Sequence, residues 1–203
     1  MSTKRAMSSA ASTAQEQSPQ AEFISWEAFQ QEYLTREDGY KYEWLAGSVE
    51  KTPSPMNAAQ LYILKNLLTF FRQLLAANTV VGELIPESDL FFAGHHRRPD
   101  ICWLTDAQIR SLARGEEAVP AFLIEIISTH DELNKVVSKM QDYRAAGVQT
   151  VWHILPAFKE VHVYSDPSLT QMAIFKGTDK CSAAPALSVF QLPVADIFYL
   201  PEG

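Results

Sequence analysis

Apolar residues recur with helical periodicity in three segments of the chain. These segments are residues 25–34, 54–78 and 128–148. The longest segment carries an apolar stripe made of Leu61, Leu64, Leu67, Leu68, Phe71 and Leu75. In the last segment Thr129 and Glu132 have the spacing of a capping box, and Gly147 is a natural C-terminal residue. The pattern therefore predicts three helices that each bury one face.

Shorter apolar runs, rich in β-branched and aromatic residues, predict strands. Residues 40–52 are predicted to form a hairpin around Gly47, and residues 150–165 a second hairpin. Single strands are predicted at residues 80–92, 99–104, 121–127 and 171–177. The polar stretch after residue 104 is expected to be a connection, and residues 178–198 a mix of turn and edge. This order of elements predicts an α/β fold in which helices flank a mixed β-sheet.

Composition divides the chain into a tail and one domain. Residues 1–20 contain no aromatic residue and are dominated by Ser, Thr, Ala and Gln, so we expect a disordered N-terminal tail. Residues 21–203 are expected to form a single domain. No apolar run approaches the roughly 20 residues of a membrane helix, and no CxxC pair indicates a zinc site or a disulfide. A cytoplasmic protein without a membrane contact is expected.

The net charge of −7 argues against a surface that attracts nucleic acid as a whole. Any such function must be local. Between residues 95 and 144, seven basic residues nearly balance eight acidic ones. A dication held there by two of the acids would make this segment basic.

One acidic residue interrupts the most apolar strand. The run "FLIEIIS", residues 122–128, has the composition of a strand buried on both faces, and Glu125 lies in its middle. A buried carboxylate without a partner would cost several kcal/mol. Glu125 therefore requires a basic side chain, a raised pKa that keeps it neutral, or a bound cation.

A second acid is predicted beside Glu125. Asp100 follows Pro99 at the start of the preceding strand, and successive strands are usually neighbours in a sheet. Two converging carboxylates suit a hard divalent cation such as Mg²⁺. The alternative is a structural ion pair of Glu125 with Arg97 or Lys139, and the spacing alone leaves both interpretations open.

Lys139 lies at the edge of the apolar stripe of the third predicted helix. Its stem can pack on the sheet while its ammonium group reaches over a strand end, near both acids. There it could orient a metal-bound water or neutralise charge on phosphorus. The alternative is an ordinary solvated helix lysine. Tyr143, on the same helix, is expected to pack in the core.

Three stretches together resemble a known family. They are "YEWLAGSVEKTPSP", "RRPDICWL" and "FLIEIISTHDELNKVVSKMQDYRAAGVQTVWHILPAFKEVHVY". From Phe23 to Tyr164 the chain resembles the Uma-two family of restriction-endonuclease-like proteins, part of the PD-(D/E)XK nuclease superfamily. This resemblance implies a restriction-endonuclease-like core.

The resemblance also implies roles for particular residues. Asp100 and Glu125 would be the metal-binding acids, and Glu43 an acid from the first hairpin that points to the same site. Without the resemblance, Glu43 would be taken as an exposed hairpin residue. The superfamily lysine that usually follows the second acid by two residues is absent here, and Lys139 would replace it. We expect one Mg²⁺ or Mn²⁺ ion to contact Asp100, Glu125 and the backbone carbonyl of Ile126.

The function expected from these features is metal-dependent endonucleolytic hydrolysis of phosphodiester bonds, with nucleic acid, in particular DNA, as substrate. The catalytic residues would be Glu43, Asp100, Glu125 and Lys139. The alternative is a catalytically inactive nuclease-like domain that acts as a binding or assembly module, because a fold does not establish chemistry. A homodimer would suit a nuclease that cuts two strands, but no sequence feature marks an interface.

Overall fold

The computed structural model describes residues 23–53, 57–129 and 131–201, so the predicted disordered tail, residues 1–20, lies outside the described residues. The helices are α1 (Trp26–Glu32), α2 (Ala58–Ala76), α3 (Asp106–Ala113), α4 (Leu133–Ala146) and α5 (Val194–Ile197). The strands are β1 (Tyr40–Leu45), β2 (Ser48–Pro53), β3 (Glu83–Pro86), β4 (Leu90–Phe92), β5 (His95–Arg97), β6 (Ile101–Leu104), β7 (Phe122–Ile126), β8 (Thr150–Leu155), β9 (Glu160–Tyr164), β10 (Met172–Lys176), β11 (Lys180–Ala183) and β12 (Leu187–Pro193). None of the helices in these described ranges is long and apolar enough to cross a membrane.

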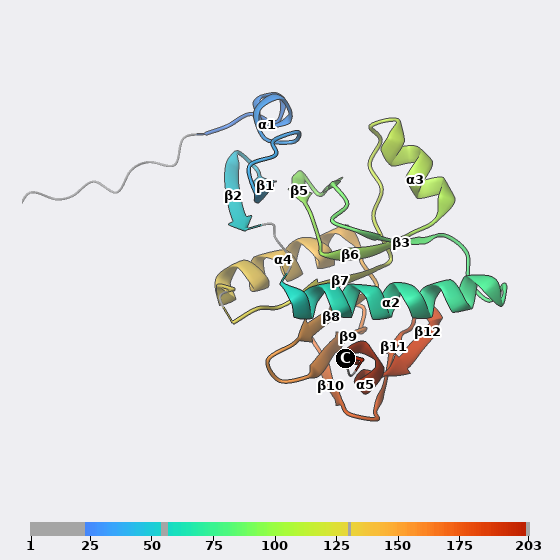
Figure 1. Cartoon of the computed structure of the whole chain (residues 1–203). Coiled ribbons are helices and arrows are strands. Elements are labelled where there is room, and N and C mark those ends of the chain that lie inside the picture. Colours follow the sequence, from blue (N-terminus) through green and yellow to red (C-terminus); the bar gives the residue numbers. More distant parts are fainter. Residues whose placement is uncertain (1–22, 54–56, 130, 202–203) are drawn as a thin grey trace, which may run out of the picture.

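A six-stranded mixed sheet in the order β10-β9-β8-β7-β6-β3 forms the centre of the molecule (Figure 1). Strands β7 and β8 are parallel, and the other neighbours in this sheet are antiparallel. A parallel pair needs a crossover connection, and α4 provides it. The predicted α/β class, with a mixed sheet and flanking helices, is therefore confirmed.

The alternation of side chains along β7 divides the core into two parts. Phe122, Ile124 and Ile126 pack in the same cluster as the buried residues of α2, whereas Leu123 packs with those of α4. Successive side chains of a strand point to opposite faces, so Glu125 must share the α4 face with Leu123. All residues of β7 are buried, as the sequence predicted for a strand covered on both sides.

A second sheet, in the order β2-β1-β5-β4, stands over α4. Its aromatic face includes Trp44 and is covered by α1 through Trp26, whose ring centroid lies 5.5 Å from that of Trp44. The opposite face carries Lys41 and Glu43 on β1 and Arg97 on β5. Contacts of Glu43 and Arg97 with α4 show that this polar face is turned toward the first sheet.

One prediction about strands was wrong, and another was incomplete. Residues 80–92, predicted as one strand, form β3 and β4, which belong to different sheets, and the following "AGHHRR" segment contains β5. Residues 178–198 form the β11–β12 ladder and α5, and their apolar side chains close the core on the α2 side. Strands β3, β4 and β5 have only three or four residues each, too few for a clear alternation, which is why periodicity failed to separate them.

All three predicted helices are present as α1, α2 and α4, but the prediction missed α3 and differs in detail. Helix α3 lies in the polar stretch that was predicted to be a connection, and Thr105 and Gln108 form its capping box, a signal that was present in the sequence. Helix α4 begins at Leu133 rather than at the predicted cap Thr129. On α2 the stripe is shifted, because Leu61 is exposed and Ile63 is buried.

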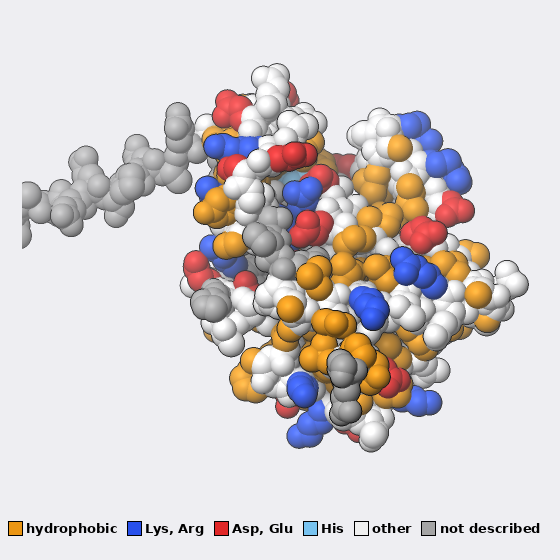
Figure 2. Space-filling model, in the orientation of Figure 1, with side chains coloured by type: hydrophobic (Ala, Val, Ile, Leu, Met, Phe, Trp, Pro, Cys, Tyr) orange, Lys and Arg blue, Asp and Glu red, His pale blue; other side chains and the backbone are white. Residues whose placement is uncertain are grey.

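Charge on the visible face of the molecule agrees with the net acidity of the chain. Figure 2 shows Lys and Arg side chains scattered among Asp and Glu side chains and large apolar areas over α2, without a continuous basic surface. A nucleic acid would find no extended cationic track on this face.

Candidate functional site

Glu125 is only 4% exposed, and its carboxylate meets α4. Both carboxylate oxygens lie 3.1 Å from Nζ of Lys139, and the hydroxyl of Tyr143 donates a hydrogen bond to Oε1. Burial raises the pKa of Glu125 above its usual value, the Lys139 ammonium opposes this, and the nearby Asp100 carboxylate adds to it. The buried glutamate is thus satisfied within the protein by a lysine and a tyrosine.

Asp100 lies one residue before β6 and faces the same side of the sheet as Glu125. Extending the antiparallel register of β6 and β7 by one residue places these two acids opposite each other. Oδ1 of Asp100 is 3.0 Å from Nζ of Lys41, and Oδ2 accepts a hydrogen bond from the backbone N–H of Ile126 at 2.7 Å. The predicted neighbourhood of the two strands is confirmed.

Glu43 enters the site from β1 and is 3% exposed. Its Oε2 accepts a hydrogen bond from Nη1 of Arg97 at 3.2 Å, and Oε1 accepts the backbone N–H of Arg98 at 2.8 Å and lies 3.4 Å from Nζ of Lys139. Burial by itself raises the pKa of Glu43, but attraction by Lys139, Arg97 and Lys41 outweighs it and lowers that pKa to about 2. Glu43 is therefore ionised at neutral pH.

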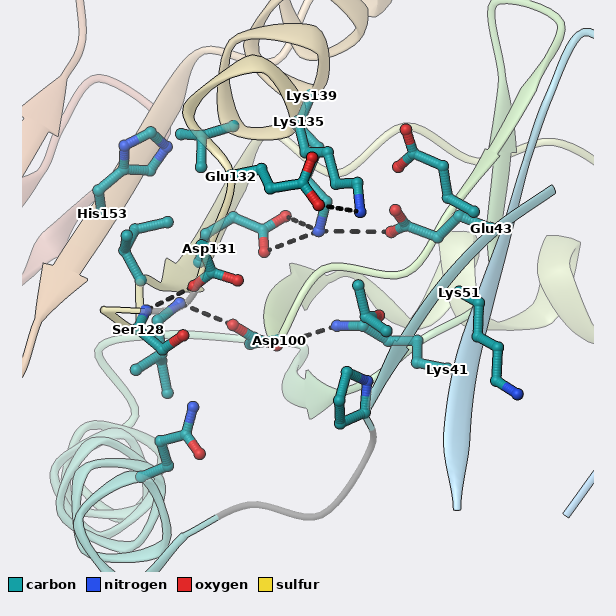
Figure 3. Close-up of a pocket in the computed structure, with 18 of the residues that line it drawn as sticks. Lys41, Glu43, Lys51, Asp100, Ser128, Asp131, Glu132, Lys135, Lys139 and His153 are labelled. Atoms are coloured by element: carbon teal, nitrogen blue, oxygen red, sulfur yellow. Dashed lines mark hydrogen bonds and ion pairs between the residues drawn. The ribbon is translucent and has the colours of Figure 1, made fainter. Parts of the chain in front are cut away.

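Lys139 joins the two sheets electrostatically. Its ammonium group contacts Glu125 from the six-stranded sheet. It also contacts Glu43 from the four-stranded sheet (Figure 3). Burial disfavours its charge, but Glu125, Glu43 and Asp100 outweigh burial and raise the pKa of Lys139 above its ordinary value. Tyr143 follows Lys139 by one helical turn, so both side chains reach Glu125 from the same face of α4.

Arg97 has no exposed surface, and it lies behind Glu43, to which it is paired. Arg97 also contacts two residues of α4. Its Nη2 lies 2.6 Å from Oδ2 of Asp142 and donates a hydrogen bond to Oγ of Ser138 at 3.0 Å. Its Nη1 is also 3.5 Å from Oε2 of Glu50 on β2. One guanidinium group thus fixes β1, β2 and α4 relative to β5.

These side chains border a hollow of about 490 Å³ between the two sheets, α4 and the N-terminus of α2. It is lined by Lys41, Glu43, Glu50, Lys51, Thr52, Pro53, Asn57, Gln60, Asp100, Glu125, Ile126, Ile127, Ser128, Asp131, Glu132, Lys135, Val136, Lys139 and His153. Figure 3 shows the Lys41, Asp100 and Lys139 side chains converging on it from different elements. His153 adds a neutral imidazole, because burial, His162 and Lys139 lower its pKa to about 4.

The charge of this cluster suits a divalent cation. Lys41, Arg97 and Lys139 face the carboxylates of Glu43, Glu50, Asp100, Glu125 and Asp142, so three positive groups stand against five negative ones, a formal charge of −2. Within the described residues no three His, Cys, Asp or Glu side chains form a ligand cage. A cation would therefore be held by one or two carboxylates, with carbonyl or water oxygens completing the shell, as Mg²⁺ prefers. The residues present fit such an ion.

The structure brings the four predicted site residues, Glu43, Asp100, Glu125 and Lys139, to one hollow. Of the two ion pairs considered for Glu125, the one with Lys139 is present, whereas Arg97 pairs with Glu43 and Asp142.

The sequence interpretation missed three participants, Lys41, Arg97 and Tyr143. The position of Lys41, two residues before Glu43 on a predicted strand, was the only signal that could have indicated it, because side chains at i and i+2 share a face. Arg97 was considered only as a partner of Glu125, and Tyr143 only as a core residue. Their contacts depend on how α4 packs between the two sheets.

Comparisons with known proteins agree with this architecture. A sequence model of the Uma2 family, described as "Putative restriction endonuclease", matches residues 26–195. A search of curated proteins gave no match. Among solved structures, the chain is similar to "a putative nuclease belonging to DUF820" from Anabaena variabilis, with a TM-score of 0.70 and 22% identity over 86% of this chain and 97% of that chain. At this identity the similarity shows a shared fold. Because the family match spans most of its length, this chain belongs to the Uma2 family of restriction-endonuclease-like proteins.

Proposed function

We propose that this protein is a divalent-metal-dependent endonuclease that hydrolyses phosphodiester bonds of nucleic acid, with DNA as the expected substrate. The observation that carries the proposal is the convergence of Asp100, Glu125 and Glu43 with Lys139 on one hollow that is open to a ligand. Carboxylates beside a buried lysine are the groups that a metal-assisted phosphoryl transfer needs.

Asp100 and Glu125 would hold Mg²⁺ or Mn²⁺, together with the backbone carbonyl of Ile126. When bound, such an ion supplies a Lewis acid and lowers the pKa of a coordinated water. Glu43, ionised and fixed by Arg97, supports the site from the opposite sheet.

Lys139 would stabilise the charge that develops on the phosphoryl oxygens. It keeps its proton, because three carboxylates outweigh the effect of burial. Its ammonium group is held between Glu125 and Glu43 at the wall of the hollow, so little reorganisation is needed when an anion enters. A preorganised charge of this kind is a large contribution to catalysis, and removing one such group typically costs about 10²–10³ in rate.

Cleavage of end-labelled single-stranded, duplex and branched DNA with Mg²⁺ or Mn²⁺ tests the proposal. Asp100→Asn and Glu125→Gln preserve shape but remove charge, so each should lower the cleavage rate at least about 10²-fold. Glu116→Gln, which changes an exposed acid outside the hollow, serves as control and should leave the rate unchanged. Cleavage by the Asp100→Asn and Glu125→Gln proteins at the rate of the unaltered protein would refute it.

One observation favours the second candidate, an inactive nuclease-like binding or assembly module. Asp100 and Glu125 each already have a lysine partner, so the folded protein satisfies them without a metal. Titration calorimetry separates the two functions. A protein that binds DNA but neither Mg²⁺ nor Mn²⁺, and that melts at a higher temperature after Glu125→Gln, would be a binding module.

A further inference from the structure

Lys41 is a second buried lysine of the hollow, with a role not covered by the proposed catalytic set. It lies on β1, and its side chain is 9% exposed. Nζ is 3.0 Å from Oδ1 of Asp100, the same kind of contact that Lys139 makes with Glu125. Each of the two acids proposed to hold the metal is thus neutralised by its own lysine, and the two lysines reach the hollow from different elements.

A purely structural role explains this arrangement poorly. Taking charges out of water carries a large desolvation cost, so buried ion pairs are weak contributors to stability. The ammonium groups of Lys41 and Lys139 also repel each other across the hollow. Two buried lysines that border an open hollow of about 490 Å³ are, however, well placed to receive an anion.

The contacts of Asp100 indicate that Lys41 can be released to bind an anion once a dication approaches Asp100. Oδ2 of Asp100 accepts a hydrogen bond from the backbone N–H of Ile126 at 2.7 Å, whereas the partner of Oδ1 is the side-chain ammonium group of Lys41. An ammonium group is a mobile point charge on a four-carbon stem, and a dication that approaches Asp100 repels it. Lys41 comes from the four-stranded sheet and lines the hollow, so an ammonium group that leaves Oδ1 would still border it.

We propose that Lys41 is an exchanging phosphate-binding lysine: it neutralises Asp100 in the metal-free protein and moves to the scissile phosphodiester when a divalent cation takes its place. No bond is made or broken in this exchange, and Lys41 keeps its proton throughout. The phosphate-binding half rests on the proposed nuclease function, whereas the exchange with the cation concerns Lys41 and Asp100 alone.

Calorimetric titration of Mn²⁺ tests the exchange without any substrate. Lys41→Met removes the competing charge and should bind Mn²⁺ at least about tenfold more tightly than the unaltered protein. Lys41→Arg keeps the charge and should bind within about threefold of it, as should Lys65→Met, which alters an exposed lysine of α2. Lys41→Gln can still donate to Asp100, so it replaces Lys41→Met if that protein fails to fold, as judged by circular dichroism.

Cleavage assays test the phosphate contact. With saturating Mn²⁺, Lys41→Met should cleave at least about 10²-fold more slowly despite tighter metal binding, and Lys65→Met should be unchanged. If the unaltered protein cleaves no substrate, the nuclease function fails, whereas the Mn²⁺ titration still decides the exchange. Equal or weaker Mn²⁺ binding by the neutral Lys41 variants would overturn the exchange, and a cleavage rate within about threefold of the unaltered protein would overturn the phosphate contact.

Discussion

Replacing Arg97 with methionine removes the guanidinium group that joins the four-stranded sheet to α4. Arg97 has no exposed surface, and its removal leaves Glu43, which is 3% exposed, and Asp142 without their closest cation. Breaking a buried ion pair by removing one partner costs about 3–5 kcal/mol. For a chain of this size that loss should lower Tm by roughly 6–20 °C.

The pKa of Glu43 indicates how much stability the cations around this carboxylate contribute. A fall from 4.5 to about 2 on folding corresponds to about 3 kcal/mol of stability at neutral pH, which Lys139, Arg97 and Lys41 contribute together, so the loss of Arg97 removes only a part of it. Because the folded pKa is the lower one, this stability is present above pH 4.5 and is lost as the pH falls toward 2. Arg97→Met should raise the folded pKa of Glu43, so the stability difference between the two proteins should narrow as the pH falls below about 4.5.

Urea unfolding followed by circular dichroism, at several pH values between about 3 and 7, measures both effects. Arg114→Met is the matched control, because Arg114 also pairs with a glutamate, Glu116, but is more than half exposed. This control should lose less than about 1 kcal/mol. A loss of less than about 1 kcal/mol in Arg97→Met at pH 7, or a difference that widens in acid, would refute the view that Arg97 helps to lower the pKa of Glu43.

Two further predictions concern packing and cysteine chemistry. In urea unfolding, Gly82→Ala should lose about 1–3 kcal/mol more of the free energy of unfolding than Gly94→Ala. Both glycines have positive φ, but of the two only Gly82 would place a Cβ against a backbone atom, the Leu104 carbonyl oxygen at 2.4 Å. Equal losses in the two proteins would contradict this. Cys102 and Cys181 are buried free thiols, and burial raises the pKa of each to about 12. A thiol reagent should therefore modify neither cysteine in the native protein and both in denaturant. Rapid labelling of either thiol before unfolding would contradict this prediction.

Several parts of the fold could be predicted from local pattern alone. Helix α1 begins at the Ser25 cap, the first hairpin turns at Gly47, and α4 ends at Gly147 in a left-handed conformation, all as the sequence indicates. Such caps and turns depend on neighbouring residues and on backbone sterics, so the sequence contains their cause. The division of residues 80–98 between two sheets depends on distant partners, which is why it was not predicted.

The sequence by itself determined that Glu125 is buried in a central strand, that Asp100 precedes the neighbouring strand and that both need a counter-charge, because hydrophobic runs and strand order follow from local composition. Only the tertiary structure decided which basic side chains pair with these carboxylates. Lys139 reaches Glu125, Lys41 reaches Asp100 and Arg97 reaches Glu43, since two sheets and α4 close around one hollow. Long-range electrostatic partners depend on how distant segments pack, and the spacing of residues along a chain does not specify that packing.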